Sequence, residues 1–146
     1  MRNTLMSMGM LLAMSSAMSA CCAFDPHSAR VDRNALIRED FMQATSGMKV
    51  AIAEYYANMG KLPTRNSDTG LPAPMDYRGQ SLRSATVGLN GVIELEFDAR
   101  SGKDGGRIRL IPDTSHANAM GLSWRCETPD YPLIKRALPT CDYVSR

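Results

Sequence analysis

Two cysteines near the C-terminal end, Cys126 and Cys141, are the side chains whose spacing most clearly predicts a covalent bond. They stand 15 positions apart, and neither His27 nor His116 has the short spacing to them that a zinc site needs. The chain begins with a segment typical of exported proteins, in which disulfides persist. We therefore predict a Cys126–Cys141 disulfide, which closes a surface loop and stabilises the fold by about 3 kcal/mol.

Residues 1–20 have the pattern of a signal peptide, because Arg2 supplies a positive charge and residues 4–20 carry none. That apolar stretch is interrupted by four serines and is soon followed by Asp25 and Pro26. A membrane-spanning helix needs about 20 apolar residues. We therefore expect export rather than a permanent transmembrane helix.

The end of this segment, Met18-Ser19-Ala20-Cys21, is similar to the bacterial lipobox, in which the cysteine is acylated and becomes the new N-terminus. We therefore expect lipid attachment at Cys21, which holds a protein at a membrane surface without spanning it. The alternative is ordinary cleavage near Ala20 or Ala23, which leaves Cys21 and Cys22 unmodified in a secreted protein.

Several short segments match the sequence motif of a known site but lack the surrounding residues that such a site needs. Asp68-Thr69-Gly70 spells an aspartic-protease motif, but it lies in a proline-rich segment, and that chemistry needs two carboxylates on rigid, apolar-flanked loops. Residues 102–106 are rich in glycine but lack the order of a phosphate-binding loop. We predict no catalytic residue, no metal site, no cofactor and no small-molecule substrate, and hence not an enzyme.

Basic residues gather in the second half of the chain, where they could contact phosphates of nucleic acid or acidic groups of a protein. The four candidate contacts are Arg100, Lys103, Arg107 and Arg109. The alternative is that arginines alternate with apolar residues because their face is solvated, with Glu94 and Glu96 neutralising them from a neighbouring strand. The 17 basic and 15 acidic residues give the chain a net charge of +2, and losing Arg2 leaves about +1, which argues against bulk capture of nucleic acid.

The rest of the chain is long enough for one domain with a modest core. We divide it into a lipid-anchor tether at residues 21–30 and a globular domain at residues 31–146. From about Asp32 the pattern is helical, with Asp32 or Asn34 as the cap. Gly60 and Pro63 end the helix. The apolar positions that fall on one face are Ile37, Phe41, Ala44, Met48, Ile52, Tyr55 and Met59.

A long irregular connection, Lys61–Arg83, separates this helix from a region of strands. The turn residues Asn90-Gly91 predict a hairpin, and the alternation in Val92–Phe97 is imperfect, which suggests either a bulge or a different assignment of the faces. Asp113–Met120 is expected to be a loop. The predicted strands are Ala85–Gly88, Val92–Phe97, Arg107–Ile111 and Gly121–Cys126. A long helix on an antiparallel sheet of about four strands is an α+β fold.

Several segments, in this order, resemble the type IV pilins. Residues 49–63, Lys-Val-Ala-Ile-Ala-Glu-Tyr-Tyr-Ala-Asn-Met-Gly-Lys-Leu-Pro, look like the end of the long pilin helix and its stop. Residues 91–93, 106–112 and 121–126 match the strands, and Leu138-Pro139 before Cys141 matches the closing cysteine. The resemblance implies a pilin-like head whose helix packs on four antiparallel strands. Its αβ-loop and disulfide-bounded region then form two edges that carry subunit contact and adhesion.

The N-terminus departs from that family. Type IV pilins have a glutamate at the fifth position after the peptidase site, and Met14 stands there if the site is Gly9-Met10. We therefore expect a protein that does not polymerise as a major pilin does.

Together, the lipobox-like segment and the pilin resemblance lead us to expect a non-enzymatic envelope lipoprotein, an interaction module of type IV pilus assembly or cell adhesion. Its expected partners are pilus subunits or other envelope proteins, and the membrane surface through the lipid. We expect it at the outer membrane of a Gram-negative bacterium, or alternatively soluble in the periplasm or secreted. The alternative function is DNA binding for DNA uptake, as in the DNA-receptor pilins of competence systems.

Overall fold

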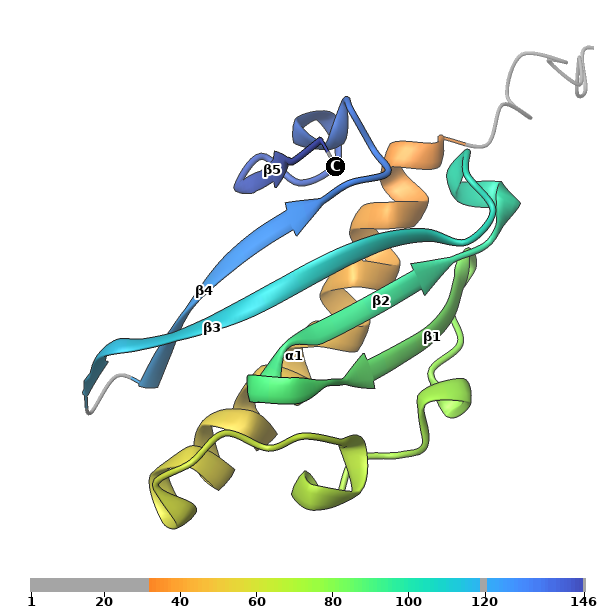
Figure 1. Ribbon diagram of the computed structural model, residues 1–146. Helices are drawn as coiled ribbons and strands as arrows, with labels where there is room; N and C mark the ends of the chain where they lie inside the picture. The colour runs from red at the N-terminus through yellow and green to blue at the C-terminus, as the bar shows by residue number, and fades with distance from the viewer. Residues whose placement is uncertain (1–31, 119–120, 146) are drawn as a thin grey trace, which may run out of the picture. The chain divides into compact units, whose positions relative to one another are not determined.

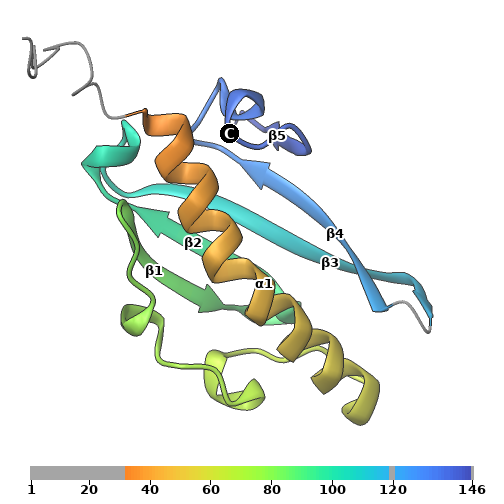
Figure 2. The same cartoon turned by 180° about the vertical axis from the view of Figure 1, so that it is seen from behind.

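The computed structural model describes residues 32–118 and 121–145, with all their side chains except those of His116 and Asn118. In this part of the chain a long helix, α1 (Arg33–Met59), covers one face of a five-stranded sheet. Figures 1 and 2 show the two layers from opposite sides. The predicted α+β fold, a long helix packed on a largely antiparallel sheet, is confirmed.

The ends of α1 lie where the sequence predicts them. The Asp32 side chain accepts a hydrogen bond from the Asn34 backbone N–H at 2.9 Å, which satisfies one of the donors exposed at a helix start. Gly60 follows Met59 in the left-handed conformation (φ 66°) and its N–H bonds the Tyr56 carbonyl, so the helix stops there.

The predicted apolar face of α1 is buried only as far as Ile52. Ile37, Phe41, Ala44, Met48 and Ile52 are all in the core, whereas the side chain of Met59 is 55% exposed. The last turns of α1 extend past the first two strands, as both views show (Figures 1 and 2), and adjoin the end of the hairpin that the third and fourth strands form, so less of their surface is buried. Each isoleucine, phenylalanine or methionine side chain buried on this face of α1 contributes about 1.5–3 kcal/mol of hydrophobic free energy.

The sheet runs in chain order and has one more strand than predicted. Its first four strands pair antiparallel, but β5 pairs parallel with β4. The strands are β1 (Leu82–Val87), β2 (Ile93–Phe97), β3 (Gly106–Asn118), β4 (Gly121–Thr128) and β5 (Cys141–Tyr143). β5 was not predicted for two reasons. Three residues are too few to show an alternation of apolar and polar side chains, and the strand forms only because the chain folds back beside β4.

The expected bulge is not in the segment Val92–Phe97, because β2 begins at Ile93 and alternates regularly from there. Ile93, Leu95 and Phe97 are fully buried toward α1, and the glutamates between them face the other side. The irregularity lies in β1, between Leu82 and Ser84. The turn between the two strands uses Asn90 (φ 57°) and Gly91 (φ 68°), so the predicted hairpin is confirmed.

The predicted loop at Asp113–Met120 is wrong for residues 113–118, which continue β3. Pairing with β4 runs on through Asp113 opposite Ser123 and Asn118 opposite Gly121. The long β3–β4 hairpin therefore extends beyond the other strands (Figure 1). The register shifts between Asp113 and Asn118, and residues 113–116 are all polar, which is why this part of β3 suggested a loop.

The αβ-loop (residues 61–81) is irregular apart from two short 3-10 turns, Asn66–Thr69 and Pro74–Asp76. Asn66 is buried and fastens the loop to β1. Its side-chain amide donates to the carbonyls of Pro72 (2.8 Å) and Ala85 (3.1 Å), and its oxygen accepts from the Val87 N–H at 2.6 Å. The proline-rich connection is thus held in one conformation against the sheet.

A carboxylate on the buried face of α1, Asp40, joins the helix to the start of β1. Its side chain is 2% exposed and accepts four hydrogen bonds. Oδ1 accepts from the Gln80 N–H at 2.8 Å. Oδ2 accepts from the Ser81 N–H and hydroxyl, both at 2.7 Å, and from the Leu82 N–H at 2.9 Å. A Cβ at Gly79 would stand 2.0 Å from Asp40 Oδ1, so only glycine fits there.

The carboxylate of Asp68 holds the first 3-10 turn together. This residue belongs to the segment Asp68-Thr69-Gly70, which matches the aspartic-protease motif. It accepts hydrogen bonds from the Thr64 N–H (2.9 Å), the Thr64 hydroxyl (3.0 Å) and Arg65 Nε (2.9 Å). The backbone hydrogen bond, and next the one from Arg65, lower the pKa of Asp68 to about 2. Hydrogen bonds to the charged form of a carboxyl group lower its pKa. Asp68 is therefore a carboxylate that stabilises a turn.

We expect the Asp68 carboxyl to titrate near pH 2, below its ordinary value of 3.8. Because the folded pKa lies below the unfolded one, the stabilising effect is fully present above about pH 4 and is lost as the pH falls toward 2. Carbon-detected NMR titration of the side-chain carboxyls measures this, and Arg65→Ala should move the midpoint upward. A wild-type midpoint at 3.8 or higher contradicts the prediction.

In residues 32–118 and 121–145 no helix is both long enough and apolar enough to cross a membrane.

Candidate interaction surface

The predicted disulfide between Cys126 and Cys141 is present and joins β4 to β5. The two residues are Cα partners in the parallel pairing, 4.5 Å apart, and both are buried. The bond closes the C-terminal loop (residues 129–140), whose two ends therefore lie on neighbouring strands.

The C-terminal loop is packed against the core by Tyr131. The Tyr131 ring meets the Phe97 ring edge-on, with centroids 6.2 Å apart, and its hydroxyl lies 2.7 Å from Ser101 Oγ. Burial raises the pKa of Tyr131 to about 12. A Cβ at Gly106 would stand 2.2 Å from the Tyr131 hydroxyl, so glycine there leaves room for the ring. Ile134, Ala137 and Leu138 are also buried.

Asp130 connects the start of this loop to the β2–β3 turn and to β3. Its Oδ1 lies 2.8 Å from Lys103 Nζ, and its Oδ2 accepts the Arg107 backbone N–H at 2.9 Å. The Asp130 side chain is only 12% exposed, so it is held more firmly than a surface ion pair.

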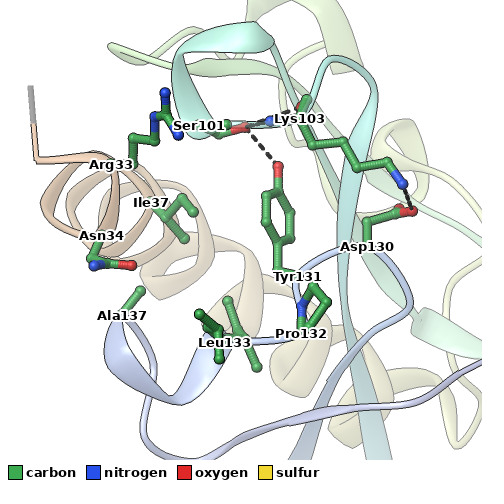
Figure 3. A pocket seen from close by; sticks show the side chains of 12 residues that line it. Arg33, Asn34, Ile37, Ser101, Lys103, Asp130, Tyr131, Pro132, Leu133 and Ala137 are labelled. Carbon is green, nitrogen blue, oxygen red and sulfur yellow. Dashed lines mark hydrogen bonds and ion pairs between the residues drawn. The ribbon is translucent and has the colours of Figure 1, made fainter.

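A cavity of about 480 Å³ lies between the start of α1, the β2–β3 turn and the C-terminal loop (Figure 3). We call it the α1–loop cavity. Its size falls in the range of small ligand pockets. Figure 3 shows Ile37 and Tyr131 on its inner walls, with Leu133 and Ala137 beside them from the loop. Arg33, Asn34 and Lys103 stand at its polar rim.

Sequence reasoning did not find this cavity, because its walls come from three distant segments. The available signal was the apolar content of the segment between the two cysteines, Tyr131-Pro132-Leu133-Ile134. Asp40 was missed as well, although it lies three residues after Ile37 and four before Ala44, on the predicted buried face.

The four predicted basic contacts lie in two places, and each meets a carboxylate. Arg100, in the β2–β3 turn, is bonded to Asp98 at 2.7 and 3.0 Å and lowers the pKa of Asp98. Lys103, in the same turn, pairs with Asp130. The structure therefore neutralises both cations of this turn locally.

Arg107 and Arg109 lie on the face of the sheet away from α1. Arg107 is 3.8 Å and Arg109 3.9 Å from Glu94, and Arg109 is 3.3 Å from Glu127. Neutralisation by Glu94, the alternative drawn from the sequence, is what the structure shows. Glu96 instead pairs with Arg83 at 3.0 Å. The pairs are half exposed, so each contributes only about 0–1 kcal/mol.

The remaining sequence-based sites lie outside the described residues. Cys21, the predicted lipid attachment, is among them, as are Cys22, His27 and the side chain of His116. Within the described ranges, no three His, Cys, Asp or Glu side chains come together as a metal site.

Residues 40–142 match the family described as pilin, the subunit of bacterial filaments. The match covers about 70% of the chain and spans α1 from Asp40, all five strands nearly to the end of β5, and the disulfide. The chain belongs to the pilin family. The resemblance to type IV pilins seen in the sequence is thus confirmed, and that family is structural rather than enzymatic.

A pilin relative is the fimbrial protein of Neisseria meningitidis serogroup A / serotype 4A. It is 30% identical over 92 residues, which cover 62% of this chain and 51% of the relative. The aligned segment thus spans about half the length of the relative it matches.

Proposed function

We propose that this pilin-family protein is a lipid-anchored interaction module of type IV pilus assembly or cell adhesion. One observation supports this most directly: the α1–loop cavity, beside the exposed Leu133 (61%), lies in the disulfide-closed edge of a pilin head. Binding sites are typically concave and lined mainly by apolar side chains, as this cavity is. The protein acts by presenting this edge and the αβ-loop to pilus subunits or other envelope proteins.

The αβ-loop supplies a second surface. Met75 is 52% exposed at its second 3-10 turn, although Asn66 holds the loop firmly. A rigid loop loses little conformational entropy on binding, which favours recognition.

The partner is tested by cross-linking in the cells that produce the protein. A photoreactive residue at position 133 or 75 should give adducts with pilus subunits, and the same residue at position 125, on the outer face of the sheet, serves as the control. Adducts absent from positions 133 and 75 would refute the pilus role.

The proposed anchor is the acylated Cys21 at the outer membrane. We expect Cys21→Ala to move the protein from the membrane to the soluble fraction, because the substitution removes the acylated side chain on which the proposed membrane binding depends. Labelled palmitate and fractionation measure this, with Cys22→Ala as the matched control that stays at the membrane. Unchanged membrane association of Cys21→Ala contradicts the anchor and leaves the soluble or secreted alternative.

DNA binding for uptake is the alternative function, and the ion pairs count against it. Each of Arg100, Lys103, Arg107 and Arg109 would have to leave a carboxylate before contacting a phosphate. Gel shifts at several salt concentrations decide the matter: salt-sensitive binding that is lost in Arg107→Gln with Arg109→Gln would favour DNA over a protein partner.

A further inference from the structure

The α1–loop cavity has apolar inner walls and an exposed apolar side chain at its mouth. Ile37, Ile134 and Ala137 are at most 3% exposed, and the Tyr131 ring is held in place by Ser101. Leu133, in contrast, is 61% exposed although it lines the same cavity. A partner's apolar side chain would contact these walls and cover Leu133 at the same time.

One guanidinium at the rim is left for a partner. Among the described residues no carboxylate pairs with Arg33, whereas Lys103 on the rim is bound to Asp130. The Arg33 side chain lies over Gly102, where a Cβ would come within 3.2 Å of Arg33 Cδ. This glycine also has a positive φ of 99°, so a side chain there is disfavoured on both grounds.

We propose that the α1–loop cavity binds a segment of a partner protein in which a bulky apolar residue stands next to a carboxylate. The apolar side chain enters the cavity, and the carboxylate pairs with Arg33. The Asn34 side-chain amide, also at the rim, can hydrogen-bond the backbone of that segment. The inference rests on the proposed role as an interaction module and names the chemistry of its partner.

The disulfide is part of this site. Every wall residue from the C-terminal loop, from Asp130 to Ala137, lies between Cys126 and Cys141. Reduction frees one end of that segment, so binding is expected to require the oxidised protein.

The test is an NMR titration of the full-length, isotope-labelled protein with acetyl-Gly-Phe-Glu-Gly-amide and its Gln counterpart. We expect shifts around Gly102, Ile134 and Ala137, and about fivefold tighter binding of the Glu peptide, since a partly exposed ion pair is of that size. Arg33→Gln should abolish this preference while the Gln peptide binds as before. Arg38→Gln, an exposed arginine one turn further along α1, is the matched control and should keep it. Leu133→Ala should weaken both peptides about threefold or more.

Four results would overturn the inference. The first is that neither peptide changes the chemical shifts at the cavity, and the second is that the preference for the Glu peptide survives in Arg33→Gln. The third is that decanoate, but neither peptide, changes the shifts at the cavity. The fourth is that these shifts change with protein concentration alone. The last would assign the cavity to a second copy of this chain.

Cross-linking separates this inference from the proposed function. If wild type, Arg33→Gln and Leu133→Ala all cross-link to pilus subunits equally through position 75, the cavity site is wrong and the pilus role stands. If wild type gives no such adducts, the pilus role fails whatever the peptides do.

Discussion

Replacing Asp40 by alanine is expected to lower the free energy of unfolding by about 3–5 kcal/mol, the largest effect we expect from a single side chain. The substitution removes the acceptor of four hydrogen bonds at a buried position. Each buried donor left without a partner costs roughly 1–3 kcal/mol, and entry of water recovers part of that. Urea denaturation followed by circular dichroism measures the change.

Neighbouring positions supply the controls for Asp40. Glu39→Ala removes an exposed carboxylate that accepts from the Gln80 side chain at 2.8 Å, and it should change the stability by no more than about 0.5 kcal/mol. Gly79→Ala should destabilise the wild type, because the added Cβ meets Asp40 Oδ1. In the Asp40→Ala background that clash is gone and the second substitution should cost less. A loss below about 1 kcal/mol for Asp40→Ala would contradict the structural role given to this residue.

Removing the Cys126–Cys141 disulfide is expected to lower the free energy of unfolding by about 3 kcal/mol, as the chain-entropy model gives for a 15-residue loop. The paired substitution Cys126→Ala and Cys141→Ala keeps the site free of unpaired thiols. The protein is best compared in a Cys21→Ala, Cys22→Ala background, so that this disulfide is the one that a reductant can reach.

Denaturation with and without dithiothreitol gives the control for the disulfide. The reductant should lower the stability of the parent protein by about the same amount as the paired substitution, and it should leave the paired variant unchanged. Equal stability of the parent and the paired variant would show that the packing of the loop against the core holds it without the disulfide.

The short-range features of this fold were predictable from the sequence. Asp32, Gly60 and Pro63 mark the ends of α1 through contacts within a few residues. Asn90-Gly91 marks the turn between β1 and β2 in the same way. The disulfide was predictable too, because the expected export favours disulfides, and the expected acylation of Cys21 leaves Cys126 and Cys141 as the natural pair among the four cysteines. Membership of the pilin family followed from the order of several such segments.

Features set by distant segments were not predictable. Asp40 meets its partners about 40 positions along the chain, and nothing near Gln80 or Ser81 in the sequence indicates a carboxylate above them. Arg107 and Arg109 looked like a basic pair, but the register of β2 against β3 places Glu94 directly opposite Arg109. One residue of slip would have moved those glutamates to the buried face, so the register decides whether this surface is basic or neutral.

The sequence by itself determined α1, the β1–β2 hairpin and the disulfide of this protein, because helix caps, turn glycines and alternation act over a few residues. Only the tertiary structure decided where its binding chemistry lies. The α1–loop cavity exists because Tyr131 packs on Phe97 and Ser101, which brings the C-terminal loop beside the first turn of α1. Arg33 and Leu133 are 100 positions apart in the chain, yet both line this cavity. The burial of apolar side chains from distant segments brings them together, and no local sequence rule could have predicted it.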